Sequence, residues 1–404
     1  MSEILSGIDI LKKNSFQILK NKTVAILANQ SAVDKDFNHL VDLVFNDKSI
    51  NLKLILAPEH GFRGTAQDMI SVADSVDSRT NVPIKSLYGK GADSLAPSKE
   101  DLKDIDILLV DLPDIGSRYY TFAQTAGYCL EAAKETGTKV IILDRPNPIN
   151  GSTVEGYGVS EGCRSFCGHL PTSNRHGLTL GELVRGFNEG FRCGGAEIAA
   201  AGAELEIIEC TGWKRESYHD ETNLPWVIPS PNMPTLETAI VYPGGCLFEA
   251  TNISEGRGTT RPFEIVGASY IDPYSWIEET LAVCKKFNLE GFKLRPLFFE
   301  PKFHKFANQT CGGVQIHIKD REIFKPLRLG LTMIWVAAQL YKGNFSWRKT
   351  TYEFIDSVPA IDLLYGNGDF RRVVENGSDV GEIFNQMSAF ESEFASTRSK
   401  LIIY

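Results

Sequence analysis

Short apolar runs alternate with helical patterns through the first half of the chain. Five runs are apolar at nearly every position rather than at alternate positions: 23–29, 52–57, 105–111, 139–144 and 205–209. Strands of this kind are covered on both faces, as in a parallel sheet whose crossovers are helices. Apolar residues at helical spacing follow several of these runs, at 39–45, 120–135 and 180–187. The pattern therefore predicts an α/β fold with a doubly wound parallel sheet.

The pattern changes after residue 226. A loop is marked there by a cluster of prolines, Pro225, Pro229, Pro231 and Pro234. The elements that follow are mixed, with strands predicted at 238–242 and 313–319 and helices at 276–287 and 329–341. We therefore predict two domains, an α/β domain over residues 1–228 and a smaller α+β domain over residues 229–404.

Composition narrows the class of protein. The chain has 404 residues, of which 43% are hydrophobic and 23% charged, and a net charge of −9. These values are typical of a soluble globular protein, and the absence of a basic stripe argues against nucleic-acid binding. No apolar run approaches the roughly 18–20 residues that span a bilayer, and the first residues lack the pattern of a signal peptide. We therefore expect a cytoplasmic protein without a membrane span, with its eight scattered cysteines reduced.

The segment LILAPEHGFRG, residues 54–64, joins an apolar run to titratable side chains. Glu59 and His60 follow the predicted strand closely, so they lie at the carboxyl edge of the sheet, where ligands bind in open α/β folds. A carboxyl group partly removed from water there suits a general acid near neutral pH. The alternative is structural: Glu59 accepts backbone hydrogen bonds and caps the turn that follows it.

The segment DLPDIGSRYY, residues 111–120, follows another predicted strand. It carries two carboxylates, Asp111 and Asp114, together with Arg118, Tyr119 and Tyr120. Carboxylates accept hydrogen bonds from hydroxyl groups, and tyrosine rings pack against a sugar face, so this loop is suited to a polyhydroxylated ligand. The alternative is an Asp–Arg ion pair that only holds the loop.

The segment TNISEGRGTTRP, residues 251–262, concentrates charge where no regular structure is predicted. Glu255, Arg257 and Arg261 lie among glycines that allow close backbone approach, as at an anion site. The alternative is a salt bridge between Glu255 and an arginine. The segment lacks the GK[ST] ending of a phosphate-binding loop, and the glycine pairs of this chain lack the rest of a dinucleotide fingerprint. We therefore predict no cofactor.

The seven histidines show none of the spacings that hold a metal ion. A metal site would need distant residues to converge, such as His60, Asp111 and His176. A serine hydrolase is also disfavoured, because the chain has no GxSxG segment. The sequence therefore predicts chemistry carried by carboxylates without a metal ion.

Nine segments, in order along the chain, resemble the bacterial exo-β-N-acetylmuramidases, a family long catalogued as a domain of unknown function. They are ILANQSAV (26–33), LAPEHGFRG (56–64), SLYG (86–89), VDLPDIGSRYYTF (110–122), LDRPNPING (143–151), HGLTLGEL (176–183), PSPNMPTLETAIVYPG (229–244), EGRGTTRPFE (255–264) and CGGVQIHI (311–318). The resemblance extends from residue 7 to the C-terminus. Segments of this length in the same order exclude chance agreement.

The resemblance implies an exo-acting glycosidase that removes N-acetylmuramic acid (MurNAc) from the non-reducing end of peptidoglycan fragments. It implies as partners disaccharides such as MurNAc–GlcNAc (GlcNAc, N-acetylglucosamine) and muropeptides. It also implies a Rossmann-like, catalytic N-terminal domain and a C-terminal domain that completes the cleft. The glutamate of the family's PEHG segment corresponds to Glu59. Polar residues of the matched segments are the candidate substrate ligands: Asn29, His60, Arg63, Asp111, Arg118, Tyr119, Tyr120, Asn147, His176, Asn232, Arg257 and Arg261.

In this interpretation Glu59 protonates the leaving GlcNAc oxygen. A second carboxylate, Glu255 or one of Asp111 and Asp114, stabilises the transition state or activates water, unless the substrate's own 2-acetamido group takes part. An arginine is expected to read the lactyl carboxylate of MurNAc, because its planar fork suits bidentate binding, and Arg257 or Arg261 is favoured. The alternatives are another hydrolase of peptidoglycan sugars (a deacetylase or a lactyl-ether-cleaving enzyme) and a non-catalytic muropeptide-binding protein.

Overall fold

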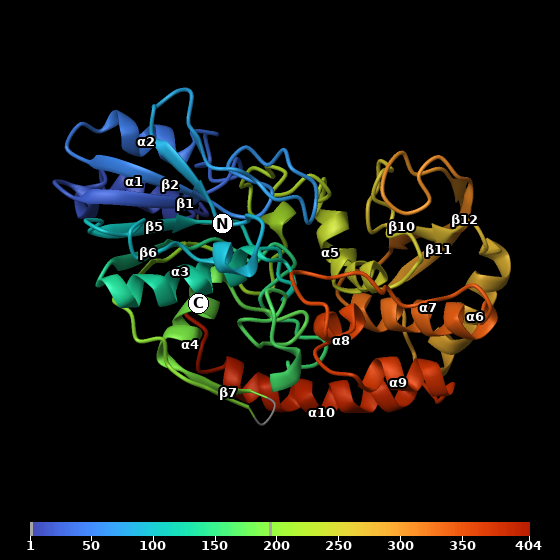
Figure 1. Ribbon diagram of the computed structural model, residues 1–404. Coiled ribbons are helices and arrows are strands. Elements are labelled where there is room, and N and C mark those ends of the chain that lie inside the picture. The colour runs from blue at the N-terminus through green and yellow to red at the C-terminus, as the bar shows by residue number, and fades with distance from the viewer. Residues whose placement is uncertain (1–2, 194–195) are drawn as a thin grey trace. The chain divides into compact units, whose positions relative to one another are not determined.

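A computed structural model describes residues 3–193 and 196–404, which form two compact units (Figure 1). The first unit contains residues 1–153, 177–231 and 396–404, and the second contains residues 154–176 and 232–395. The chain therefore passes from one unit to the other at several points along its length. The two-domain division at residue 228 stays a prediction.

The first unit is built on a seven-stranded sheet in the order β3-β4-β2-β1-β5-β6-β9. Its strands are β1 (Thr23–Ala28), β2 (Asn51–Ala57), β3 (Ser75–Val76), β4 (Pro83–Ser86), β5 (Ile107–Asp111), β6 (Lys139–Leu143) and β9 (Leu205–Ile208). Every neighbouring pair is parallel except the edge pair of β3 and β4. The parallel strands alone follow the order 3-2-1-4-5-6 of Rossmann-type sheets, which confirms the predicted fold class.

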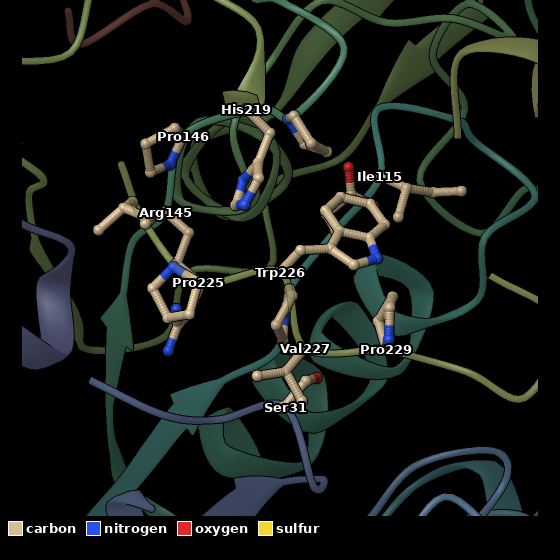
Figure 2. A pocket seen from close by; sticks show the side chains of 13 residues that line it. Ser31, Ile115, Arg145, Pro146, His219, Pro225, Trp226, Val227 and Pro229 are labelled. Carbon is tan, nitrogen blue, oxygen red and sulfur yellow. The ribbon is translucent and has the colours of Figure 1, made fainter. Parts of the chain in front are cut away.

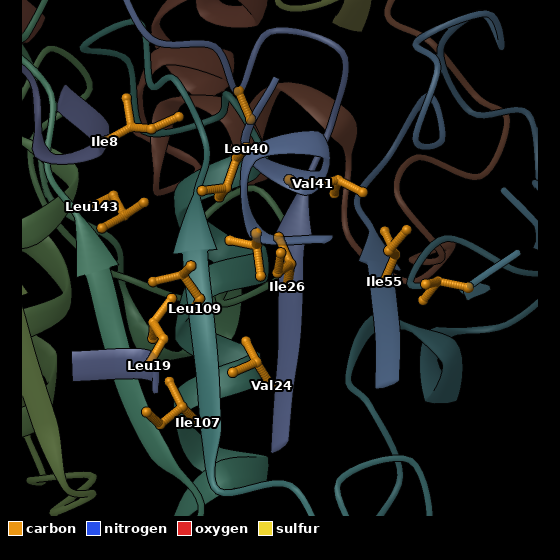
Figure 3. Close-up of a cluster of buried hydrophobic side chains, with 14 of the residues drawn as sticks. Ile8, Leu19, Val24, Ile26, Leu40, Val41, Ile55, Ile107, Leu109 and Leu143 are labelled. Carbon is orange, nitrogen blue, oxygen red and sulfur yellow. The ribbon is translucent and has the colours of Figure 1, made fainter. Parts of the chain in front are cut away.

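Helices cover both faces of this sheet. Helices α1 (Gly7–Lys13) and α2 (Leu40–Asn46) pack on one face, and α3 (Phe122–Thr136) and α4 (Leu180–Glu189) pack on the other (Figure 1). Figure 3 shows the first of these cores, in which Ile8 and Leu40 of the helices meet Val24, Ile26 and Leu109 of the strands. Burial on both faces explains why the strands are apolar at nearly every position. A short antiparallel pair, β7 (Phe191–Cys193) and β8 (Ala196–Ile198), follows α4.

The second unit contains a three-stranded antiparallel sheet and most of the remaining helices. Its strands, in the order β10-β12-β11, are β10 (Ile265–Ala268), β12 (Cys311–Ile318) and β11 (Phe292–Phe299). The helices are α5 (Leu236–Gly245), α6 (Pro273–Lys286), α7 (Pro326–Leu340), α8 (Ala360–Tyr365), α9 (Asp369–Asn376) and α10 (Gly381–Arg398). The strand predicted at 313–319 and the helices predicted at 276–287 and 329–341 are confirmed. Within the described ranges, no helix is long and apolar enough to cross a membrane.

The strand predicted at 238–242 is wrong, because these residues lie inside helix α5. The side chain of Thr235 caps the helix by accepting a hydrogen bond from the backbone N–H of Thr238 at 3.3 Å. Residues 238–245 are all buried, and the helix packs against α7. A helix buried on every side has no amphipathic period, so a short β-branched apolar run gives no signal that separates it from a strand.

Candidate active site

The carboxyl ends of β1 and β5 lie side by side in the first unit, where Ala28 pairs with Asp111. The sheet order reverses at this point, because β2 lies beyond β1 on one side and β6 lies beyond β5 on the other. Ligands of open α/β sheets bind at such a reversal. The loops after β1, β2, β5 and β6 all open on this edge, and they contain most of the predicted site residues.

Glu59 follows β2 and is only 5% exposed. Its Oε2 accepts a hydrogen bond from the hydroxyl of Thr121 at 2.6 Å, and its Oε1 accepts one from the backbone N–H of Met69 at 3.3 Å. Thr121 directly precedes α3, but its hydroxyl makes no cap bond to that helix. The buried carboxyl group is therefore held in one orientation by a neutral hydroxyl and a backbone amide.

The sequence analysis missed Thr121 as a functional residue. The signal was a hydroxyl residue at the start of a predicted helix, which is normally interpreted as a cap. A hydroxyl group both donates and accepts hydrogen bonds, so Thr121 can stay bonded to Glu59 whether that carboxyl group is ionised or protonated.

His60 adopts a left-handed backbone conformation, with φ of 70°, in a turn closed by a 3.0 Å bond from the N–H of Gly61 to the carbonyl of Pro58. Its Nδ1 lies 2.9 Å from the carbonyl oxygen of Ala66. A carbonyl can only accept, so Nδ1 carries the proton, and Nε2 is the acceptor of the neutral ring. Among the described residues no hydrogen bond joins His60 to Glu59.

Arg63, in the same loop, forms an ion pair with Asp77 and stacks on the ring of Phe62 at 4.6 Å. Its guanidinium is therefore held by the loop itself, although 55% of the side chain is exposed. It remains a predicted substrate ligand.

Asp111 is fully buried at the end of β5 and is bound by Arg145 through both oxygens, at 2.5 and 2.7 Å. Arg145 also donates to the carbonyl of Val33 at 2.8 Å. An Asp–Arg ion pair, the alternative considered for this loop, therefore exists between Asp111 and Arg145. A carboxylate whose two oxygens are both occupied is poorly placed to take a proton from water.

The rest of this loop is also buried. Oδ2 of Asp114 accepts the backbone N–H of Gly116 at 2.7 Å, which closes a turn. Arg118, Tyr119 and Tyr120 are 1%, 3% and 5% exposed. The tyrosine rings are therefore largely buried.

Two predicted asparagine ligands tie loops together. Asn29 donates to the carbonyl of Pro229 at 2.9 Å and accepts from the hydroxyl of Ser31 at 2.6 Å. Asn147 donates to the carbonyl of Leu178 at 2.9 Å and accepts the N–H of Ile149 at 3.1 Å. Both ends of each amide are occupied, so these residues shape the loops around the strand ends. The other two polar candidates, His176 and Asn232, are buried in the second unit.

A pocket of about 50 Å³ lies at this edge of the first unit (Figure 2). Side chains from the loops after β1, β5 and β6 and from the segment 219–229 line it, among them Asp114, Arg145, His219 and Trp226. The ring of His219 meets that of Trp226 edge-on, with centroids 5.1 Å apart. The sequence analysis missed His219 and Trp226, because they lie in a loop whose path the sequence pattern does not predict.

Glu255, in the second unit, is fully buried among cationic groups. Its Oε2 lies 2.8 Å from Nζ of Lys305, and its Oε1 lies 3.0 Å from Nδ1 of His304 and 3.4 Å from Nε of Arg257. Burial alone raises the pKa of Glu255, but Lys305, His304 and Arg257 outweigh burial and hold the pKa well below its usual range. Glu255 is therefore an ionised acceptor at neutral pH and cannot serve as a general acid.

Arg257 and Arg261 differ in how firmly they are held. Arg257 is buried and donates to Glu249 at 2.7 Å, whereas the side chain of Arg261 is 44% exposed and lies 3.5 Å from Glu264. Gly256 has a φ of 81°, and a Cβ there would meet the carbonyl oxygen of Ile265 at 2.3 Å. This glycine therefore allows close packing of the loop on its own backbone.

The described part of the chain holds no group of three or more His, Cys, Asp or Glu side chains placed to bind a metal ion. His60, Asp111 and His176 form no such group. All eight cysteines are buried and free.

Comparisons with known proteins agree along the whole chain. Residues 24–237 match the family described as exo-β-N-acetylmuramidase NamZ, N-terminal, and residues 240–404 match its C-terminal counterpart. The peptidoglycan β-N-acetylmuramidase NamZ of Bacillus subtilis (strain 168) is 39% identical over 402 residues, which cover 100% of this chain and 92% of that protein. Two crystal structures of DUF1343 family proteins from Bacteroides fragilis NCTC 9343 are 28% and 30% identical, with TM-scores of 0.86 and 0.74. Each match covers 100% of this chain and 99% of the other.

Proposed function

The chain belongs to the exo-β-N-acetylmuramidase NamZ family, and we propose that it releases MurNAc from the non-reducing end of peptidoglycan fragments such as MurNAc–GlcNAc. It is a glycoside hydrolase. The observation that carries this proposal is the full-length match to a peptidoglycan β-N-acetylmuramidase. The buried, oriented carboxyl group of Glu59 supplies the chemistry that such a reaction needs.

Glu59 acts as the general acid. It protonates the glycosidic oxygen as the bond to the GlcNAc leaving group breaks, because an unprotonated sugar alkoxide is a poor leaving group. The hydroxyl of Thr121 donates to Oε2 of the carboxyl group at 2.6 Å, and this bond can persist before and after the proton leaves.

Asp114 supplies the second acidic group. Both oxygens of Asp111 are bound by Arg145, whereas Asp114 lies in the wall of the pocket at the same sheet edge. It stabilises the positive charge of the oxocarbenium-like transition state or takes a proton from the attacking water. We do not assign Glu255 as the second catalytic carboxylate, because its oxygens already contact Lys305, His304 and Arg257 in the second unit.

Arg261 reads the lactyl carboxylate of MurNAc. Among the four arginines of the matched segments, Arg63 is paired with Asp77, Arg118 is buried, and Arg257 is bound by Glu249. Among the residues that the structure describes, the guanidinium of Arg261 contacts one carboxylate, that of Glu264 at 3.5 Å, and 44% of its side chain is exposed. A guanidinium held this loosely can exchange its partner for a substrate carboxylate.

Incubation with MurNAc–GlcNAc, followed by mass analysis of the products, tests this function. Free MurNAc and free GlcNAc are expected. Loss of an acetyl group or of lactate from an intact disaccharide would instead indicate a deacetylase or a lactyl-ether-cleaving enzyme. Binding of the disaccharide without turnover would indicate a non-catalytic binding protein.

Chelation is expected to leave this activity unchanged. The proposed reaction uses only carboxyl groups of the chain, so removal of divalent ions takes away none of its parts. The measurement is the rate of MurNAc release after dialysis against EDTA, with the same protein dialysed against buffer as control. Activity that is lost and then restored by zinc or another divalent ion would contradict the proposed chemistry.

A further inference from the structure

The pocket at the sheet edge of the first unit has an apolar wall. Pro113, Ile115, Trp226 and Val227 contribute to it, and the segment that carries the last two is held by hydrogen bonds such as that of Asn29 to Pro229 at 2.9 Å. Such a wall favours a methyl group over a hydroxyl group, because a hydroxyl buried there loses its hydrogen bonds to water.

His219 adds one specific polar atom to this pocket. The ring is hydrogen-bonded to the backbone of Leu224, and its Nε2 is buried without a hydrogen-bond partner among the described residues. Burial, opposed by the bond to Leu224, lowers the pKa of His219, so the ring is neutral at pH 7. Because Nε2 makes no hydrogen bond to any described residue, Nδ1 is the ring nitrogen bonded to Leu224. Nε2 of the neutral ring is then an acceptor that can bind an N–H or O–H donor of a ligand. A buried polar atom without a partner destabilises the site, so a ligand that donates a hydrogen bond to it gains affinity.

Arg145 adds a donor. Its Nε and Nη2 are occupied by Asp111 and by the carbonyl of Val33, and within the described residues its Nη1 makes no hydrogen bond. The bidentate bond to Asp111 fixes the plane of the guanidinium, so the remaining N–H groups of Arg145 have a fixed direction. The pocket therefore combines an apolar wall, one acceptor and one donor.

We propose that this pocket is a subsite for the 2-acetamido group of an N-acetylated amino sugar. The methyl group packs against Trp226 and Val227, the amide N–H donates to Nε2 of His219, and the carbonyl accepts from Nη1 of Arg145. This inference rests on the proposed function, in which both sugars of the substrate carry such a group.

Size and charge favour an acetamido group over other parts of the substrate. A volume of about 50 Å³ suits a small group, such as the four non-hydrogen atoms of an acetamido group, better than a whole pyranose ring. The charge of Arg145 is already paired with Asp111, and the carboxyl group of Asp114 lies in the same lining. A neutral amide is therefore a better ligand for this pocket than the lactyl carboxylate.

MurNAc–GlcNAc with N-acetyl groups on both sugars, compared with the same disaccharide carrying N-propionyl groups on both sugars, tests the subsite. One additional methylene in a filled pocket lowers kcat/KM by about 10–200-fold, and we expect a loss in this range for the wild-type protein. Val227→Ala enlarges the pocket. It is expected to reduce the ratio of kcat/KM between the N-acetyl and the N-propionyl substrate by about tenfold. Ile228→Ala is the matched control, because Ile228 is the next residue, is 47% exposed and does not line the pocket. Equal activity on both glycosides in the wild-type protein would overturn the proposal.

Disaccharides in which only one sugar carries the N-propionyl group identify the sugar that is bound. A loss confined to modified MurNAc assigns the pocket to that sugar, and a loss confined to modified GlcNAc assigns it to the leaving group. Equal rates for both modified disaccharides and the natural one would contradict either assignment.

A binding experiment separates this inference from the proposed function. Calorimetric titration of Glu59→Gln with MurNAc, GlcNAc and their de-N-acetylated forms requires no turnover. The N-acetylated form of the sugar that occupies the pocket is expected to bind at least about tenfold more tightly than its de-N-acetylated form. His219→Leu is expected to remove this preference. His219→Gln keeps a hydrogen-bond acceptor and is expected to retain part of the preference. If the wild-type protein releases no MurNAc but this preference is present, the function is wrong and the subsite stands. Equal binding of the acetylated and deacetylated sugars would contradict the proposed subsite and leave the proposed function unaffected.

Discussion

Glu59→Gln is expected to lower kcat on MurNAc–GlcNAc by about 10²–10⁴-fold, the usual contribution of a general acid. Glutamine has nearly the same shape, and its amide oxygen can accept the bond from Thr121 that now reaches Glu59 at 2.6 Å. It cannot donate a proton to the leaving oxygen. The measurement is steady-state kinetics of MurNAc release, together with the thermal unfolding midpoint to confirm that the fold is intact.

Leaving-group dependence tells a general acid apart from a binding residue. A chromogenic MurNAc glycoside with an acidic phenol leaves without full protonation, so Glu59→Gln is expected to retain far more activity on it than on the disaccharide. Glu100→Gln, at a side chain that is 82% exposed, is the matched control. Near-wild-type turnover of the disaccharide by Glu59→Gln would exclude Glu59 as the acid.

Glu255→Gln is expected to lower the free energy of unfolding of the second unit by about 3–5 kcal/mol. Glu255 is completely buried, and removal of its charge takes the carboxylate partner from Lys305 at 2.8 Å, whereas Arg257 keeps its ion pair with Glu249. Chemical denaturation followed by tryptophan fluorescence measures this loss. Glu300→Gln, at an exposed ion pair with Lys302, is the control and is expected to cost less than about 1 kcal/mol.

The stability difference between wild type and Glu255→Gln depends on pH in a predictable direction. The pKa of Glu255 in the folded protein lies below its ordinary value of 4.5, so its contribution is complete above pH 4.5 and is lost as the pH falls toward the folded-state pKa. The difference is therefore expected to shrink as the pH falls below 4.5. A variant of full stability that has lost activity would contradict the structural assignment and return Glu255 to the catalytic candidates.

The sequence by itself determined the architecture of the first unit. The strands β1, β5 and β6 follow from apolar runs that are buried on both faces, a pattern typical of a parallel sheet covered by helices. The helix predicted at 120–135 ends where expected, because Gly137 takes the left-handed conformation that a helix end favours. The sequence also placed Glu59 at the carboxyl edge of the sheet. These features follow from periodicity and from single residues, so they need no knowledge of distant contacts.

The tertiary structure alone decided which partner each polar side chain has. Asp111 is joined to Arg145, 34 residues away, and Glu59 to Thr121, 62 residues away. The sequence places these residues at one sheet edge, but it does not say which side chains touch. For the same reason the sequence could not select between the catalytic and the ion-pair interpretations of Glu255.

Two kinds of segment could not be predicted from the sequence: a helix that is buried on every side and an irregular loop. Helix α5 was predicted as a strand because its surroundings are apolar all round, which removes the periodicity that identifies a helix. His219 and Trp226 come together in a proline-rich loop that has no period at all. Sequence patterns record the boundary between core and water along each element. The contacts of a loop are set by elements far away in the chain, so only the folded structure brings them together.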